Sequence, residues 1–202
     1  MAGQKIKYTK TERARQKKIL KVSLRMLPLF EAMGKLLMIT INNITENIER
    51  IEETIDRNNE AATPWLAVLS DSWVDAGGLI SVNEVFTKPV DIAGVRVQQY
   101  ESVDFDVADI TDATPLWVDS AIDLMKEQLQ LMAEKKCLED QIELLEEELH
   151  EVRARVKLFE NRRIPNARTA IRKIDQKLQD DERLMIATAK VVKTKQAEEA
   201  ER

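Results

Sequence analysis

The sequence predicts a fold dominated by α-helix, in which a long antiparallel two-helix coiled coil carries a small β-hairpin insert. Charged residues make up 33% of the 202 residues and aromatic residues only 4%, which is the composition of long helices rather than of a compact core. Two stretches repeat apolar residues at steps of three and four, which is the spacing of helices packed lengthwise. Between them, apolar and polar residues alternate as in strands. The hydrophobic fraction of 44% excludes a disordered chain.

The N-terminal helix is predicted within residues 1–62. Thr9 or Thr11 can cap its start, and Glu12 favours that end of the helix dipole. A bend or irregular turn is expected at Pro28, because proline removes a helical hydrogen bond. After it, the apolar seam follows steps of 4, 3, 4, 3 and 4 through Leu37, Ile41, Ile44, Ile48, Ile51 and Ile55.

The insert is predicted to occupy residues 63–114 and to begin with a short helical segment. Thr63 followed by Pro64 has the pattern of an N-cap and first helical residue. The segment from Trp65 to about Val74 then forms either a helix of its own or a bent continuation of the first one. Gly77-Gly78 is expected to end it.

A β-hairpin is predicted next. The stretches "LISVNEVF" and "IAGVRVQQYESVDF" alternate apolar and polar residues, and Lys88-Pro89 lies between them. An acidic loop, "DVADITDATP", closes the insert.

The C-terminal helix is predicted within residues 115–202, with a seam that changes phase twice. One change lies near Cys137 and the other beside Pro165, where the seam is offset by one residue. Such offsets alter the local winding of a coiled coil without ending the helix. The main seam runs through Ile142, Leu145, Leu149, Val152, Val156 and Phe159, and then Ile164, Ala167, Ile171, Ile174 and Leu178.

Two helices of roughly 50 and 80 residues would measure on the order of 75 and 120 Å. A chain that forms a hairpin insert between them most simply folds back, so the two helices are predicted to pair antiparallel. Both termini would then lie at one end and the hairpin towards the other. A parallel homodimer of each helix is the alternative.

Charge is sorted along the sequence. Residues 1–25 carry nine lysines and arginines against one glutamate, and residues 153–195 carry thirteen against five acids. Residues 101–151 carry sixteen acids against three bases. Antiparallel pairing brings the two basic stretches together. A solvated helix surface is one explanation and a partner of opposite charge is the other, but no nucleic-acid module accompanies the bases, so nucleic acid is not expected.

Patterns that would predict catalysis or cofactor binding are absent from the sequence. It has no glycine-rich phosphate loop and no glycine fingerprint after a strand. His150 and Cys137 are single residues of their type without metal-site spacing. We therefore expect no catalytic residue, cofactor or metal. A lone cysteine and the lack of a signal peptide or bilayer-length apolar run predict a cytoplasmic protein.

Three stretches of the chain resemble the D subunit of V-type and archaeal-type rotary ATPases, in its bacterial variant. The basic helical start "TKTERARQKKILKVSLRMLPLFEAMGKLLM" is similar to the family's N-terminus, and "DIAGVRV" to its hairpin. The family's C-terminal helix has an Arg-Val-Asn-Ala-Leu-Glu-like run, an Ile-Pro pair, an Ala-Ile step and an acidic-Glu-Arg cluster before a lysine tail. The corresponding stretches here are Arg155 to Glu160, Ile164-Pro165, Ala170-Ile171, Asp181-Glu182-Arg183 and Lys190 to Lys195. Lys157 and Leu158 depart from this pattern, and the insert is longer than the minimal family hairpin.

The resemblance implies a non-catalytic rotor shaft in the central stalk. Such a shaft stands in a ring of alternating A and B subunits, binds the small F subunit and docks on the funnel-like C or d subunit of the membrane rotor. It couples ATP hydrolysis or synthesis to rotation and hydrogen ion or other ion transport. The implied location is cytoplasmic and peripheral, with no direct membrane insertion.

We predict that such a shaft contacts its ring or the F subunit through basic residues near the end of the helix pair where both chain termini lie. Pro165 is expected to kink the helix and shift its seam, which presents the arginines beside it; a tolerated bend with solvated arginines is the alternative. The candidate interface residues are Lys17, Lys18, Lys21, Arg25, Arg162, Arg163, Arg168 and Arg172.

Two other classes of protein remain alternatives. A prefoldin-like chaperone also joins antiparallel helices through β-hairpins, but it would expose apolar tips where this chain has charged termini. A structural coiled-coil tether would form parallel homodimers and would give no reason for a hairpin.

Overall fold

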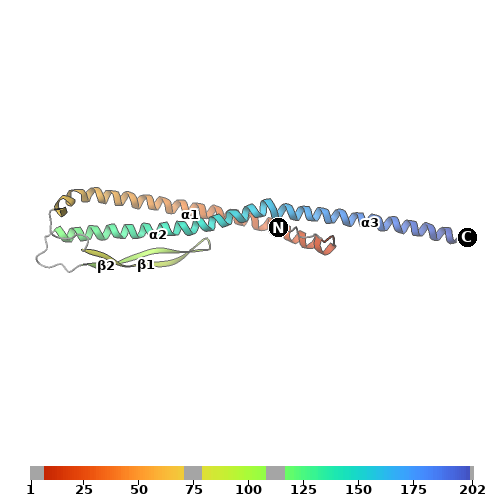
Figure 1. Ribbon diagram of the computed structural model, residues 1–202, viewed down its shortest axis with the longest axis horizontal. Helices are drawn as coiled ribbons and strands as arrows, with labels where there is room; N and C mark the ends of the chain where they lie inside the picture. The colour runs from red at the N-terminus through yellow and green to blue at the C-terminus, as the bar shows by residue number, and fades with distance from the viewer. Residues whose placement is uncertain (1–6, 71–78, 108–116, 201–202) are drawn as a thin grey trace. The chain divides into compact units, whose positions relative to one another are not determined.

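The fold consists of three long helical stretches and one β-hairpin. The computed structural model describes residues 7–70, 79–107 and 117–200. Its elements are α1 (Lys10–Ser70), β1 (Ile80–Ile92), β2 (Val95–Val107), α2 (Trp117–Leu158), a π-helical turn (Phe159–Arg163) and α3 (Ile164–Ala200), as Figure 1 shows. The predicted fold class, helical with a β-hairpin insert, is confirmed.

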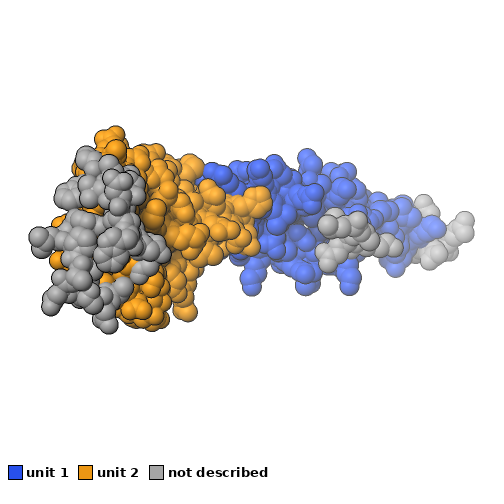
Figure 2. All heavy atoms as spheres, turned by 60° about the vertical axis from the view of Figure 1, so that its left-hand side comes forward, with its two compact units in different colours: residues 1–32, 152–202 blue, residues 33–151 orange. Residues whose placement is uncertain are grey.

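The chain divides into two compact units, which Figure 2 shows in different colours. Unit 1 comprises residues 1–32 and 152–202, and unit 2 comprises residues 33–151. Both ends of the chain therefore belong to unit 1 and the hairpin belongs to unit 2. Helices α1 and α2 each contribute to both units.

Helix α1 begins as the sequence predicts. The backbone N–H of Glu12 donates a hydrogen bond of 3.2 Å to Thr9 Oγ1, so Thr9 and not Thr11 is the capping residue. Glu12 also accepts a hydrogen bond from the side chain of Gln16, one turn later. The first turn thus has a side-chain acceptor for one of the backbone donors that a helix start leaves unpaired.

The two prolines of α1 do not interrupt it. Of the bend or irregular turn expected at Pro28, the irregular turn is wrong, because the α-helix continues through this residue. Pro28 is exposed, so water can hydrate the carbonyl that its missing N–H leaves without a partner. Thr63 is not an N-cap either: its hydroxyl donates to the carbonyl of Asn59, one turn back in the same helix, at 3.0 Å. Of the two possibilities left open for the segment after Pro64, the continuation of the first helix is therefore observed, as far as Ser70.

In unit 2, α1 and α2 run antiparallel side by side (Figure 1). Asn58 donates to Glu127 at 3.3 Å, Gln128 donates to Asn59 at 2.9 Å, and Lys135 forms an ion pair of 2.7 Å with Glu52. From Glu52 to Asn58 the number rises on α1, while the partner's number falls from Lys135 to Glu127 on α2. Further along the same two helices, the apolar seam includes Leu37, Ile44, Leu145 and Leu149, all of which are buried.

The predicted hairpin is confirmed, but its turn is not at Lys88-Pro89. Ile92 pairs with Val95, and the turn between them consists of Ala93 at φ 54° and Gly94 at φ 87°. Positive φ at both central residues gives the twist that a two-residue hairpin turn needs. The carboxylate of Asp91 accepts a hydrogen bond of 2.9 Å from the Gly94 N–H, which stabilises the turn.

Pro89 lies within β1 and pairs with Gln98. Counting back from the hydrogen-bonded pair that closes the turn, Pro89 falls at a position where backbone groups point away from the partner strand. Proline therefore costs this ladder no hydrogen bond. Lys88 and Pro89, which separate the two alternating stretches in the sequence, are therefore part of strand β1.

The hairpin rests on α2 through strand β2. The Gln141 side chain, only 5% exposed, donates a 2.7 Å hydrogen bond to the carbonyl of Gln98, and Val97 beside it is 1% exposed. At the base of the hairpin, Leu79 packs with Val118 and Ile122 of α2 in a small apolar cluster. These contacts give the hairpin the support that an isolated pair of strands lacks.

In unit 1, α1 pairs antiparallel with the last part of α2 and with α3. Arg13 forms an ion pair with Asp175, and Phe30 packs edge-to-face on Phe159, with ring centroids 5.5 Å apart. The seam expected on the C-terminal helix is buried at Val152, Phe159, Ile164, Ala167 and Ile174 and half-buried at Val156, Ile171 and Leu178. Ala170, which was not predicted, is buried as well.

The seam offset beside Pro165 takes the form of the π turn. The Ile164 N–H donates to the carbonyl of Phe159, five residues back, where an α-helix would bond four residues back. The extra residue is thus absorbed in one wide turn. No such turn occurs near Cys137, where α2 is regular.

Two predictions lie outside the described residues. They are the end of the short helix at Val74 and Gly77-Gly78, and most of the acidic loop at 106–115.

Gly94→Ala should destabilise the hairpin by about 1 kcal/mol, because an L-residue at positive φ is strained. No atom lies within 4 Å of the added Cβ, so the backbone alone sets this cost. Ala93→Gly should stabilise the hairpin by a similar amount. Amide hydrogen exchange of β1 and β2 measures both changes, and equal exchange in the two variants would contradict the turn assignment.

Candidate interaction surface

The division into units is also a division of charge. Unit 1 holds 23 lysines and arginines against 10 aspartates and glutamates, a net charge of +13. Unit 2 holds 8 against 26, a net charge of −18. The overall charge of −5 therefore results from two strongly charged units of opposite sign. Unit 1 is suited to acidic partners and unit 2 to basic ones.

All eight predicted interface residues are exposed, and all lie in unit 1. The side chains of seven of them form no hydrogen bond, ion pair or ring contact with any described residue: Lys17, Lys18, Lys21, Arg25, Arg162, Arg168 and Arg172. The eighth, Arg163, is already engaged, since its guanidinium lies 5.0 Å from the centroid of the Phe159 ring. Side chains without a partner in their own unit are available for contacts with another protein.

Two grooves bring some of these cations together with residues that were not predicted. A groove of about 510 Å³ is lined by Lys17 together with Lys10 and Arg13. Another, of about 430 Å³, is lined by Arg168 and Arg172. Asp175 lines both.

The ion pair of Arg13 with Asp175 connects α1 to α3 beside these grooves. The sequence analysis did not find this pair, because the periodicity that it used describes apolar positions and not charged ones. An alignment of the two seams in antiparallel register could have found it, since oppositely charged residues beside a seam pair across it.

The Phe159 side chain is buried at the π turn and contacts two other side chains. It is 7% exposed, Phe30 contacts it from α1, and Arg163 covers its ring from within the turn. Edge-to-face packing of this kind adds about 0.5–1.5 kcal/mol beyond the burial of area. The sequence placed Phe159 on the seam but gave no sign that Arg163 would fold back onto it.

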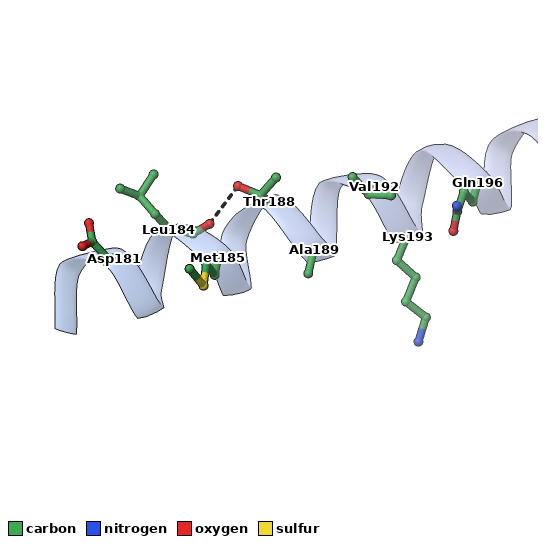
Figure 3. A pocket seen from close by; sticks show the side chains of 8 residues that line it. All are labelled: Asp181, Leu184, Met185, Thr188, Ala189, Val192, Lys193 and Gln196. Atoms are coloured by element: carbon green, nitrogen blue, oxygen red, sulfur yellow. Dashed lines mark hydrogen bonds between the residues drawn. The ribbon is translucent and has the colours of Figure 1, made fainter. Parts of the chain in front are cut away.

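The last part of α3 presents apolar side chains to solvent. Leu184, Met185 and Val192 are 62%, 72% and 48% exposed and line an open groove of about 700 Å³ (Figure 3). Every residue that lines this groove belongs to α3. Because Arg13 faces Asp175 and α1 begins at Lys10, the stretch from about residue 183 onwards has no described helix beside it.

Three titratable groups in unit 2 have raised pKa values. Burial, followed by Glu134 and Cys137, raises the pKa of Tyr100 above its ordinary value. Burial, followed by Asp140 and Glu134, raises the pKa of the Cys137 thiol. The hydrogen bond to Glu52 raises the pKa of Lys135. At neutral pH, all three groups are therefore protonated.

Among residues 7–70, 79–107 and 117–200, no three histidine, cysteine, aspartate or glutamate side chains gather as ligands for a metal ion. None of the described helices has a stretch that is both long enough and apolar enough for a membrane span.

Phe159→Ala should destabilise the chain by about 3–5 kcal/mol, the range for removing a buried aromatic side chain. Leu158→Ala is the matched control, because the neighbouring Leu158 is 44% exposed and should cost much less. Urea unfolding of both variants measures the difference. Equal losses would contradict the role of Phe159 as the buried centre of the π turn.

Cys137 should react slowly with a thiol reagent, because its raised pKa lowers the fraction of reactive thiolate. At pH 8, labelling of the native protein should be several-fold slower than labelling of the urea-unfolded chain, and the difference should shrink as the pH rises above 9. Rates followed by mass spectrometry give the measurement. A native rate equal to or above the unfolded rate would contradict the assignment.

Comparison with known proteins identifies the family. The family model for the D subunit of ATP synthase matches residues 12–194. The D subunit of the V-type ATP synthase of Borreliella burgdorferi is 32% identical over 197 residues, which cover 94% of this chain and 94% of the relative. The D subunit of the V-type ATP synthase of Chlamydia muridarum is 34% identical over 118 residues, 55% of this chain and 56% of the relative. With a family match over most of its length and a relative this similar across 94% of it, the chain belongs to the family of ATP synthase D subunits.

Proposed function

We propose that this chain is the non-catalytic rotor shaft in the central stalk of a V/A-type ATPase. In this role it transmits rotation between a ring of A and B subunits, where ATP is hydrolysed or made, and the membrane ring that translocates ions. Its further partners are the F subunit and the funnel-like C or d subunit. The shaft is cytoplasmic and peripheral to the membrane.

The observation that carries this proposal is the extension of α3 beyond the start of α1. From Glu182 to Ala197 every residue is exposed, and the part beyond residue 183 is about 27 Å long at 1.5 Å per residue. A single helix with large apolar residues in water gains little stability from packing. Such an end is suited to a sleeve formed by surrounding subunits, in which one helix can turn.

The charge of the two units supports the same role. A positively charged unit 1 favours a position among acidic surfaces, and a negatively charged unit 2 favours basic ones. A shaft held at two places by surfaces of opposite sign keeps its orientation along the stalk. Family membership argues against the chaperone and the tether.

The first test is native mass spectrometry of the complex purified gently from its own cells. We expect one copy of this chain with three copies each of two large nucleotide-binding subunits and with a small partner. Recovery as a homo-oligomer alone, at low and high salt, would contradict the proposal.

Replacement of the apolar end of α3 tests the sleeve. Leu184→Gln, Met185→Gln and Val192→Gln together should leave the Tm of the purified chain nearly unchanged, because all three side chains are exposed. The same variant should lower ATP-driven ion transport by the assembled complex several-fold. Ala187→Gln with Thr194→Gln, on the same helix outside the groove, is the control. Normal transport by the triple variant would contradict a role for this end.

A further inference from the structure

The π turn is not needed to keep the seam in register. Buried and half-buried seam residues follow one another at steps of three and four from Leu145 to Phe159 and again from Ile164 to Leu178, but Phe159 and Ile164 are five apart. A chain shorter by one residue would step by four, and a regular α-helix would then carry both parts of the seam in phase. The fold therefore holds one more residue than its core requires.

Pro165 does not explain the wide turn either. A π turn can relieve the clash between a proline ring and the preceding turn. However, Pro28 lies inside α1 in the same unit, and the helix passes through it in regular α conformation. A proline at an exposed position is thus accommodated in this chain without a π turn. Because π-helical turns are uncommon and concentrate at functional sites, a further reason is needed.

The extra residue lengthens the exposed stretch between two buried residues. A step of three or four leaves two or three residues outside the core, and the π turn leaves four: Glu160, Asn161, Arg162 and Arg163, all exposed. Arg163 is held on the Phe159 ring, so it helps to fix the turn. The side chain of Arg162 has no hydrogen-bond, ion-pair or ring partner among the described residues.

We propose that the π turn displays Arg162 to a carboxylate on another subunit, while Arg163 anchors the turn. The proposal rests on the rotor-shaft function, since it names the chemistry of a contact made by that shaft. A guanidinium binds a carboxylate through two parallel hydrogen bonds, and the net charge of unit 1 favours an acidic partner. The partner is therefore a protein segment that carries aspartate or glutamate.

The test compares three variants of the full-length chain. Deletion of Asn161 combined with Pro165→Ala converts the turn into regular α-helix. Arg162→Gln removes the guanidinium, with its charge and its paired donors, and leaves the turn in place. Glu160→Gln, in the same turn but of opposite sign, is the matched control. Thermal unfolding of each purified chain is measured first, followed by its affinity for an ATPase complex depleted of this subunit.

The deletion variant should unfold at or above the wild-type Tm. Both the deletion variant and Arg162→Gln should bind the depleted complex about tenfold more weakly, which is the loss expected for one charge-assisted hydrogen-bonding contact. Glu160→Gln should bind like the wild type. Unfolding of the deletion variant would show that the extra residue is structural, and wild-type affinity of Arg162→Gln would show that the arginine is not a contact; either result would overturn the proposal.

A photo-crosslinker in place of the exposed Asn161, which leaves Arg162 intact, separates this proposal from the rotor-shaft function. If the wild-type chain does not bind ATPase subunits, the rotor-shaft function fails. A crosslink in cells to an Asp- or Glu-bearing peptide, lost when those acids become amides, would still support the display of Arg162. A crosslink to a segment without carboxylates, or none at all, would overturn it.

Discussion

The apolar seam between two antiparallel helices is the constraint on which the rest of the structure depends. With 4% aromatic residues, the chain buries apolar side chains within each unit chiefly where two helices pair. Each helix must keep one face directed at its partner over many turns, so any irregularity in the backbone has to be compensated within a turn or two. The hairpin is secondary to this seam, because it is held by Gln141 and the cluster around Val118 on a helix that the seam already fixes.

The treatment of the prolines follows from this constraint. Pro28 and Pro165 are both exposed, so each leaves the seam itself apolar and continuous. Only Pro165 stands next to a change of helix type, and the five-residue step there keeps Phe159 and Ile164 on the same face. Phe30 then meets Phe159 across the pair. The residues on both sides of the offset, Phe159 and Ile164, are therefore buried like the regular part of the seam.

Because burial is confined mainly to the faces where helices pair, most described side chains are exposed or half-buried and can contact other proteins. The two units use this surface in opposite ways, with a net charge of +13 on one and −18 on the other, and the side chains of seven of the eight predicted cations have no partner among the described residues. The apolar end of α3 adds a surface that needs a cover. The charge of each unit and the exposed apolar side chains of α3 are the surfaces on which the proposed rotor shaft would contact other subunits.

The sequence by itself determined the helices, the seam, the hairpin and the sorting of charge, because each depends on local periodicity or on composition. It also located the one-residue offset beside Pro165. Only the tertiary structure decided how that offset is absorbed, since an insertion can be taken up by supercoiling or by one wide turn, and the packing of Phe30 against Phe159 accompanies the second solution. The same holds for the turn at Ala93-Gly94, for Thr63 inside a helix, and for the pairs Arg13 with Asp175 and Gln141 with Gln98. These features depend on which residues meet across the chain, and local spacing carries no information about such partners.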